Sequence, residues 1–151
     1  MDDAGLMPRR AGRVLVVDAG QRVLLLHGFD PAVPDQPFWF TVGGGAEPGE
    51  SLADAAAREL REEAGLAVEP GALGDPVWHR VVEFGFDGTR YRQEEDFFLL
   101  RVDSAVVSLA GMDEIEQQTV DEFRWWGAAE MEAADEAFVP PELPGLLRDL
   151  T

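Results

Sequence analysis

The sequence contains no cysteine and no lysine in its 151 residues. Without cysteine, the chain cannot form a disulfide, a thiolate metal site or a cysteine nucleophile. It also has no apolar run long enough to span a bilayer, and residues 1–10 show no apolar run of the kind that marks a signal peptide. Together these absences favour a reducing compartment and predict a cytoplasmic protein.

Positive charge is scarce as well. Twelve arginines stand against 30 acidic residues, which gives a formal net charge of −18. Because nucleic-acid binding depends on basic side chains that neutralise phosphates, this charge argues against a nucleic-acid polymer as partner, and the same repulsion argues against an anionic membrane. An acidic chain can still bind a phosphorylated small molecule, provided that arginines or metal ions lie at the site.

The length of the chain fits one domain. Residues 1–10 are expected to form a flexible N-terminal segment, and residues 11–151 a single domain. Strand-like runs occur at 13–17, 22–27, 38–42, 77–86, 89–102 and 123–126, and helical stretches at 51–64, 127–136 and 143–150. Hairpins interspersed with helices predict a mixed sheet with helices on its faces, in the α/β class.

The helical stretch that follows Ser51 carries its charges in an unexpected place. Ser51 is placed as an N-cap and Gly65 as a C-terminal stop. On a helical wheel, Glu63 lies inside the apolar face, with Glu59 at its edge and Glu62 beyond Glu59. Like charges at this spacing repel by roughly 0.2–0.5 kcal/mol, and partial burial adds to the cost unless a cation is present. The pattern therefore indicates either a divalent-metal site, since Mg²⁺ prefers such oxygen ligands, or a solvated acidic face.

The glycine-rich loop before this helix and the helix itself resemble the Nudix box, G-x5-E-x7-R-E-U-x-E-E-x-G-U, in which U is a bulky aliphatic residue. Every defined position matches over residues 44–66: Gly44, Glu50, Arg58-Glu59-Leu60, Glu62-Glu63 and Gly65-Leu66. The strands before the box, the long hairpin after it and the pair Trp125-Trp126 agree with the layout of the family. The resemblance thus covers roughly residues 11–138.

The resemblance implies a Nudix-type α/β/α sandwich in which the box forms a loop–helix–loop. It also implies hydrolysis of a diphosphate linkage in a nucleoside-diphosphate-X type substrate by attack of water at phosphorus, with Mg²⁺ or Mn²⁺ as cofactor. The metal ligands implied are Glu59, Glu62 and Glu63, with the carbonyl of Gly43 or Gly44. Arg58 matches the arginine that orients a metal-site glutamate, and it joins Glu62 and Glu63 among the expected catalytic residues.

A further acidic ligand or general base is expected outside the box. Strand alternation places Glu95 on the same face as Phe97 and Leu99, and Glu95 is the residue that we favour. The alternative is that Glu95 is one more acid in an acidic protein. Other candidates for the base fall in an expected loop: Glu114, Glu116 and Glu122.

Three further residues are expected to bind the substrate. Arg80 and Arg92 are candidates for phosphate contacts, and Phe38 is a candidate for stacking on a base. The alternative for each arginine is a surface charge, and for Phe38 it is core packing.

Two functions remain open at this point. The first is the metal-dependent hydrolase, which would act on a small phosphorylated nucleotide-like substrate. The alternative is a catalytically silent Nudix domain that binds a nucleotide as a sensor or regulatory module; the complete box favours the hydrolase. Because many relatives are dimers, a homodimer is compatible with the resemblance.

Overall fold

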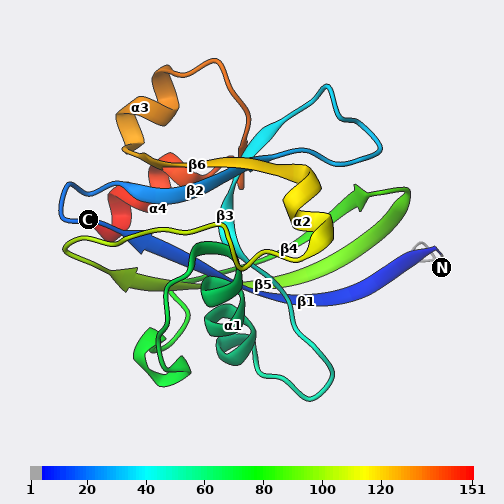
Figure 1. Cartoon of the computed structure of the whole chain (residues 1–151), viewed down its shortest axis with the longest axis horizontal. Coiled ribbons are helices and arrows are strands. Elements are labelled where there is room, and N and C mark those ends of the chain that lie inside the picture. The colour runs from blue at the N-terminus through cyan, green and yellow to red at the C-terminus, as the bar shows by residue number, and fades with distance from the viewer. Residues whose placement is uncertain (1–4) are drawn as a thin grey trace.

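The computed structural model describes residues 5–151, and its strands form one mixed, curled sheet (Figure 1). The strands are β1 (Leu6–Val17), β2 (Val23–Gly28), β3 (Phe38–Gly45), β4 (Trp78–Phe86), β5 (Thr89–Arg101), β6 (Val120–Trp126) and β7 (Phe138–Val139). The helices are α1 (Leu52–Ala64), the 3-10 helix η1 (Pro70–Leu73), α2 (Glu114–Thr119), α3 (Ala128–Ala133) and α4 (Leu143–Leu150). Within residues 5–151, no helix has the length and apolar character needed to cross a membrane.

Strand β1 lies at the centre of the sheet. It runs parallel to β5 and antiparallel to β3, so that Arg13 is opposite Phe97 on one side and Gly43 on the other. Strand β3 joins two parts of the sheet, because residues 38–41 pair with β2 and residues 42–45 pair with β1. The glycine-rich end of β3 is therefore held directly against β1.

Helices cover both faces of this sheet. On the face that we call the α1 face, Val14 and Val16 of β1 pack in one core with Leu60 of α1. On the opposite face, which we call the α3/α4 face, Leu15 and Val17 pack in a second core with residues of α3 and α4. Alternating side chains of a single strand thus contribute to two cores. The expected mixed sheet with helices on both faces is confirmed.

Helix α1 begins and ends where its caps predict. The Ser51 hydroxyl accepts a hydrogen bond from the backbone N–H of Asp54 at 3.0 Å. Gly65 adopts φ 73° and its N–H donates to the carbonyl of Arg61, which satisfies a free carbonyl of the last turn. Leu60 is fully buried, and Glu63 exposes only 4% of its surface, as the helical wheel predicted.

The long hairpin is also confirmed. Asp87 and Gly88 connect β4 to β5 with φ values of 49° and 83°, the left-handed conformations that a two-residue hairpin turn of this kind requires.

The N-terminal segment differs from the expectation. Residues 6–10, expected to be flexible, are the first part of β1 and pair in parallel with residues 90–94 of β5. Backbone pairing with β5 orders this stretch although it has no apolar run of its own. Residues 1–4 lie outside the described part of the chain, so the expectation for them stays a prediction.

The segment around Glu116 was expected to be a loop and is instead helix α2. The Asp113 side chain accepts from the Glu116 N–H at 2.8 Å, while the Glu116 carboxylate accepts from the Asp113 N–H at 3.1 Å. This reciprocal capping box stabilises a helix of only six residues. Such a short element gives almost no periodic signal, which is why the pattern did not predict it.

Gly12 sets how closely α1 can approach β1. A Cβ atom at Gly12 would lie 2.1 Å from the carbonyl oxygen of Leu52 and 3.0 Å from the Cβ of Ala56. We expect Gly12→Ala to lower the free energy of unfolding by about 1–3 kcal/mol, because the helix must move away from the strand. Urea unfolding at neutral pH measures the change.

A matched control is Gly145→Ala in α4, where an added Cβ would meet no atom within 4 Å. Since alanine favours a helix over glycine, we expect this variant to be neutral or slightly more stable. Equal stability of Gly12→Ala and the unmodified chain would contradict the close helix–strand contact.

Candidate active site

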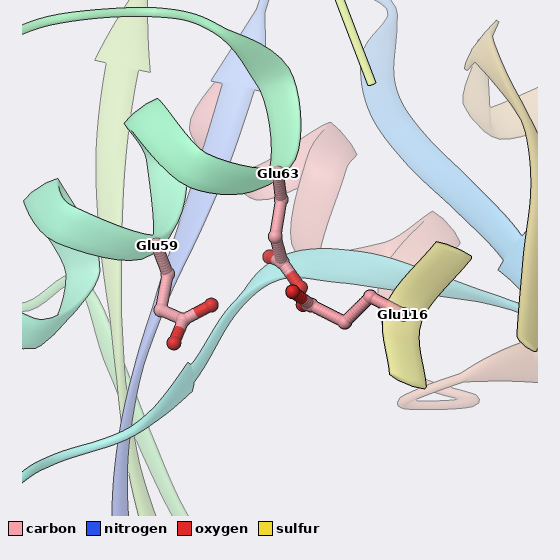
Figure 2. Close-up of side chains that lie close together, drawn as sticks. All are labelled: Glu59, Glu63 and Glu116. Atoms are coloured by element: carbon pink, nitrogen blue, oxygen red, sulfur yellow. The ribbon is translucent and has the colours of Figure 1, made fainter. Parts of the chain in front are cut away.

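Three carboxylates from two helices converge at one point (Figure 2). Glu59 and Glu63 belong to α1, and Glu116 reaches them from α2. One oxygen from each side chain lies within 4.8 Å of the others, and within residues 5–151 this is the only such group of three potential metal ligands. Figure 2 shows the carboxyl groups of Glu63 and Glu116 pointing toward each other.

Glu63 is the most deeply buried member of the cluster. Its Oε1 accepts a hydrogen bond of 2.7 Å from the backbone N–H of Gly43. Burial, together with the neighbouring Glu116 and Glu59 carboxyls, raises the pKa of Glu63 well above its usual value. A single backbone donor does not offset the burial of a full negative charge. This position therefore favours either a proton or a cation.

Glu59 lies against the glycine-rich end of β3. A Cβ atom at Gly44 would lie 2.8 Å from the Glu59 carboxyl carbon, so only glycine lets the strand approach the carboxylate this closely. Burial raises the pKa of Glu59, and Glu116 acts in the same direction, while the hydrogen bond from Arg58 opposes them.

Arg58 ties the loop to the helix. Its Nε and Nη2 each donate to an oxygen of Glu50 at 2.9 Å, and its Nη2 also donates to the carbonyl of Gly45 at 3.0 Å. The third nitrogen, Nη1, donates to Glu59 at 2.8 Å and reaches Glu62 at 3.4 Å. The hydrogen bond from Arg58 lowers the pKa of Glu50 to about 2. Arg58 thus contacts Glu59 directly, and its role in orienting a glutamate of the site stays a prediction.

A cleft of about 450 Å³ opens beside this cluster. Residues of β1, the box loop, α1 and the segment before α2 line it: Arg9, Gly45, Glu47, Arg58, Glu59, Glu62, Gly111 and Asp113. Glu62, with 39% of its side chain exposed, is more accessible than Glu59, whose side chain is 13% exposed. A ligand in the cleft can therefore contact Glu62 directly.

Glu95, the residue favoured from the sequence, lies on the α3/α4 face, in line with Phe97 but opposite α1. Arg13 Nε donates to its Oε2 at 2.9 Å, and Arg80 donates to its Oε1. Burial opposes ionisation, but Arg13 and Arg80 outweigh it and lower the pKa of Glu95. The structure does not bring Glu95 into the carboxylate cluster, and a carboxylate held by two arginines is a poor base. Arg80 is likewise engaged in this ion pair.

Arg13 connects the Glu95 ion pair to the glycine-rich end of β3. Its Nη1 donates to the carbonyl of Gly43 at 2.8 Å, while the N–H of the same glycine holds Glu63. A guanidinium at that distance repels a cation, which disfavours the carbonyl of Gly43 as a metal ligand. Of the two carbonyls expected from the resemblance, Gly44 is the one that this contact leaves available.

The other expected substrate-binding residues do not line this cleft. Arg92 is exposed and lines a second cleft of about 430 Å³, where Arg9 and Arg10 also contribute. Phe38 is half-buried, with its ring centroid 5.6 Å from that of Phe40. The roles of Arg92 and Phe38 in binding stay predictions.

Two residues of the site carry no strong signal in the sequence. From the sequence, Glu116 is only an alternative candidate for the base. The spacing of Asp113 and Glu116 could predict a capped helix, but it could not predict that the Glu116 side chain reaches α1. Arg9 lines the cleft from a segment that was expected to be flexible.

A mixed sheet between helices, with a glycine loop and helix that present clustered carboxylates, is the architecture expected of a Nudix hydrolase domain. A family model described as the NUDIX domain matches residues 7–146. The chain therefore belongs to the Nudix family, and the prediction from the box is confirmed. A search among curated proteins found no significant match.

Solved structures agree on the fold. The chain is similar to a MutT protein from Methanosarcina mazei Go1, with a TM-score of 0.68 and 20% identity over 95% of this chain and 93% of that chain. It is also similar to the Ap4A hydrolase of C. elegans (TM-score 0.59, 22% identity, 95% and 96% covered). A third similar structure is the dihydroneopterin triphosphate pyrophosphohydrolase of E. coli (TM-score 0.57, 24% identity, 84% and 86% covered).

The raised pKa of Glu63 leads to a prediction about the stability of the metal-free protein toward unfolding. Between the ordinary glutamate value and the raised value, the folded protein binds more protons than the unfolded chain. The stability of the metal-free protein must therefore fall as pH rises through this window. We expect Glu63→Gln to reduce this loss and to be more stable than the unmodified chain at pH 8, measured by urea unfolding with chelator at pH 5 and pH 8.

Glu69→Gln serves as the control, because Glu69 is exposed and precedes η1 without a side-chain hydrogen bond. It should keep the pH dependence of the unmodified chain. The same pH dependence in Glu63→Gln would show that Glu63 is not the source of this loss.

Proposed function

We propose that this protein is a metal-dependent hydrolase that cleaves the diphosphate linkage of a nucleoside-diphosphate-X type substrate. The observation that carries the proposal is the convergence of Glu59, Glu63 and Glu116 beside an open cleft. Burial raises the pKa of both Glu59 and Glu63, so the cluster has negative charge that the protein itself does not offset. A divalent cation supplies the missing charge.

The donor set fits magnesium. Carboxylate and carbonyl oxygens are the ligands that Mg²⁺ prefers, and Mn²⁺ accepts the same set. The residues that would hold the ion are Glu59, Glu63 and Glu116, with the carbonyl of Gly44. When bound, such an ion polarises phosphate oxygens and makes a coordinated water more acidic. Arg58 and the N–H of Gly43 orient Glu59 and Glu63 for this task.

Glu62 is suited to accept the proton of the attacking water. It lines the cleft, and its only ion pair among the described residues is the 3.4 Å contact with Arg58. Glu63, in contrast, is buried and bonded to Gly43.

In the proposed reaction, water forms a bond to one phosphorus and the bond from that phosphorus to the bridging oxygen breaks. The products are a monophosphate and a second phosphorylated molecule.

Two similar structures support this substrate class. One is named for hydrolysis of Ap4A and the other for dihydroneopterin triphosphate, and both of these compounds contain linked phosphates. The net charge of −18 supports a small substrate over a nucleic-acid polymer, and the lack of cysteine supports a cytoplasmic location. A homodimer stays a prediction.

The first test is a screen of the purified protein against a panel of nucleoside-diphosphate derivatives, with Mg²⁺ or Mn²⁺ and with chelator, followed by detection of released products. We expect cleavage of at least one class that depends on the metal. Binding of nucleotides without turnover across the whole panel would instead support the sensor module.

The second test separates the proton acceptor from the metal ligands. We expect Glu62→Gln to lower kcat by roughly 10²–10⁴-fold with little change in Mg²⁺ affinity, since general-base catalysis contributes that much. Glu116→Gln should weaken Mg²⁺ binding by roughly 10- to 100-fold or more, because even residues that only support metal ligands contribute this amount. Calorimetric titration with Mg²⁺ and steady-state kinetics measure the two effects.

The matched control for Glu116→Gln is Glu114→Gln, an exposed residue of the same short helix. It should behave like the unmodified protein. Unchanged Mg²⁺ binding in Glu116→Gln would remove Glu116 from the proposed ligand set.

A further inference from the structure

Two arginines line the cleft beside the carboxylates, and they differ in their ion pairs with the described residues. Arg58 is engaged with Glu50, Glu59 and Glu62. Arg9 enters the cleft from β1, and within residues 5–151 no carboxylate oxygen lies within ion-pair distance of its guanidinium. Among the described residues that line the cleft, Arg9 is therefore the cation without a carboxylate partner in residues 5–151.

Among residues 5–151, Arg9 differs from the other partly buried arginines because it has no carboxylate partner in this part of the chain. Four arginines of the described chain are partly buried: Arg9, Arg13, Arg58 and Arg80. The last three all form ion pairs with carboxylates. Burial and the nearby charge of Arg13 lower the pKa of Arg9, and they outweigh the opposing effect of Tyr91, Glu59 and Glu95. A bound anion would oppose this lowering.

The neighbours of Arg9 hold its guanidinium beside the active site. On one side, the guanidinium carbon lies 5.6 Å from the centroid of the Tyr91 ring. On the other side, a Cβ atom at Gly45 would lie 2.6 Å from Arg9 Nε and 2.8 Å from Nη2, so glycine leaves the space that the side chain occupies. Gly45 also accepts the hydrogen bond from Arg58, and Arg9, Glu59 and Glu62 line the same cleft. Arg9 thus shares a cleft with one of the proposed metal ligands, Glu59.

The charges of the cleft define which anion fits. Besides the two arginines, the cleft is lined by four carboxylates: Glu47, Glu59, Glu62 and Asp113. These groups repel a free anion, so Arg9 alone cannot attract one strongly. An anion that arrives with a divalent cation experiences less repulsion, because the ion, held by Glu59, Glu63 and Glu116, would offset negative charge beside the cleft. The guanidinium of Arg9 can then meet the remaining phosphate oxygens.

We propose that Arg9 binds a phosphoryl group of a metal-bound diphosphate, as a substrate-binding residue of this site. Its planar guanidinium can donate two parallel hydrogen bonds to phosphate oxygens, which a lysine cannot do. The inference rests on the proposed function for the identity of the ligand. One phosphoryl group of the substrate would then lie in the part of the cleft that Arg9 and Gly45 line.

Calorimetric titration with methylenediphosphonate, a diphosphate analogue that resists hydrolysis, tests the proposal in the presence of saturating Mg²⁺. We expect Arg9→Ala to bind the analogue roughly 10- to 100-fold more weakly, the amount expected for loss of a charge-assisted bidentate contact. Arg9→Lys should bind with intermediate affinity, since it keeps the charge but not the paired donors. Arg61→Ala, which removes the same charge from an exposed position of α1, should bind like the unmodified protein.

A second titration, with Mg²⁺ alone, separates binding from a structural role. Arg9→Ala should bind Mg²⁺ at least as tightly as the unmodified protein, because the change removes a positive charge near the carboxylates. Loss of Mg²⁺ affinity in Arg9→Ala would assign the residue to the structure of the site and overturn the proposal. Unchanged affinity of Arg9→Ala for the analogue would overturn it too, as would failure of the unmodified protein to bind the analogue with Mg²⁺.

Binding of the analogue is independent of turnover. If the unmodified protein binds the analogue, and Arg9→Ala and Arg9→Lys show the expected order, the Arg9 site stands even when no substrate of the panel is cleaved. In that case only the proposed hydrolysis fails. Cleavage of a substrate, combined with equal affinity of all variants for the analogue, would instead support the hydrolase and overturn the Arg9 site.

Discussion

The carboxylate of Glu63, buried where α1 meets β3, is the constraint on which the rest of the site depends. Its only hydrogen-bond donor among the described residues is the N–H of Gly43, and the carboxyl of Glu116 faces it. To place it there, α1 must approach β1 as closely as Gly12 allows. The chain thus accepts an unfavourable charge inside a well-packed contact. Such a local conflict is expected at a functional site.

Strand β1 organises the site through three features along its length. Gly12 faces α1 and sets the position of the helix. Arg13, on the opposite face, bridges Glu95 and the carbonyl of Gly43. The ion pair on the α3/α4 face therefore also fixes β3 at Gly43, whose N–H donates to Glu63. Arg9 extends toward the cleft from the first half of the strand. Substitutions on either face of β1 can therefore affect the same carboxylate cluster.

The features that the sequence predicts correctly are those with local determinants. Ser51 and Gly65 define the ends of α1, and helical periodicity placed Glu63 on the buried face. The features that the sequence does not predict are those in which distant segments meet. Alternation correctly put Glu95 on the side of Phe97, but no local pattern shows that this side is opposite α1. Glu116 reaches the cluster through a six-residue helix, and its position depends on the packing of the whole domain and not on the residues beside it.

The carboxylate cluster is divided between two parts of the chain that differ in how firmly they are held. Glu59 and Glu63 are on a helix of 13 residues that is locked to β1 and β3, whereas Glu116 is on α2, which has six residues and depends on its capping box. Isolated helices of that length are unstable. Unwinding of α2 therefore removes one carboxylate from the cluster while the sheet and α1 stay folded. The completeness of the cluster therefore depends on the local stability of α2, and not only on the stability of the whole domain.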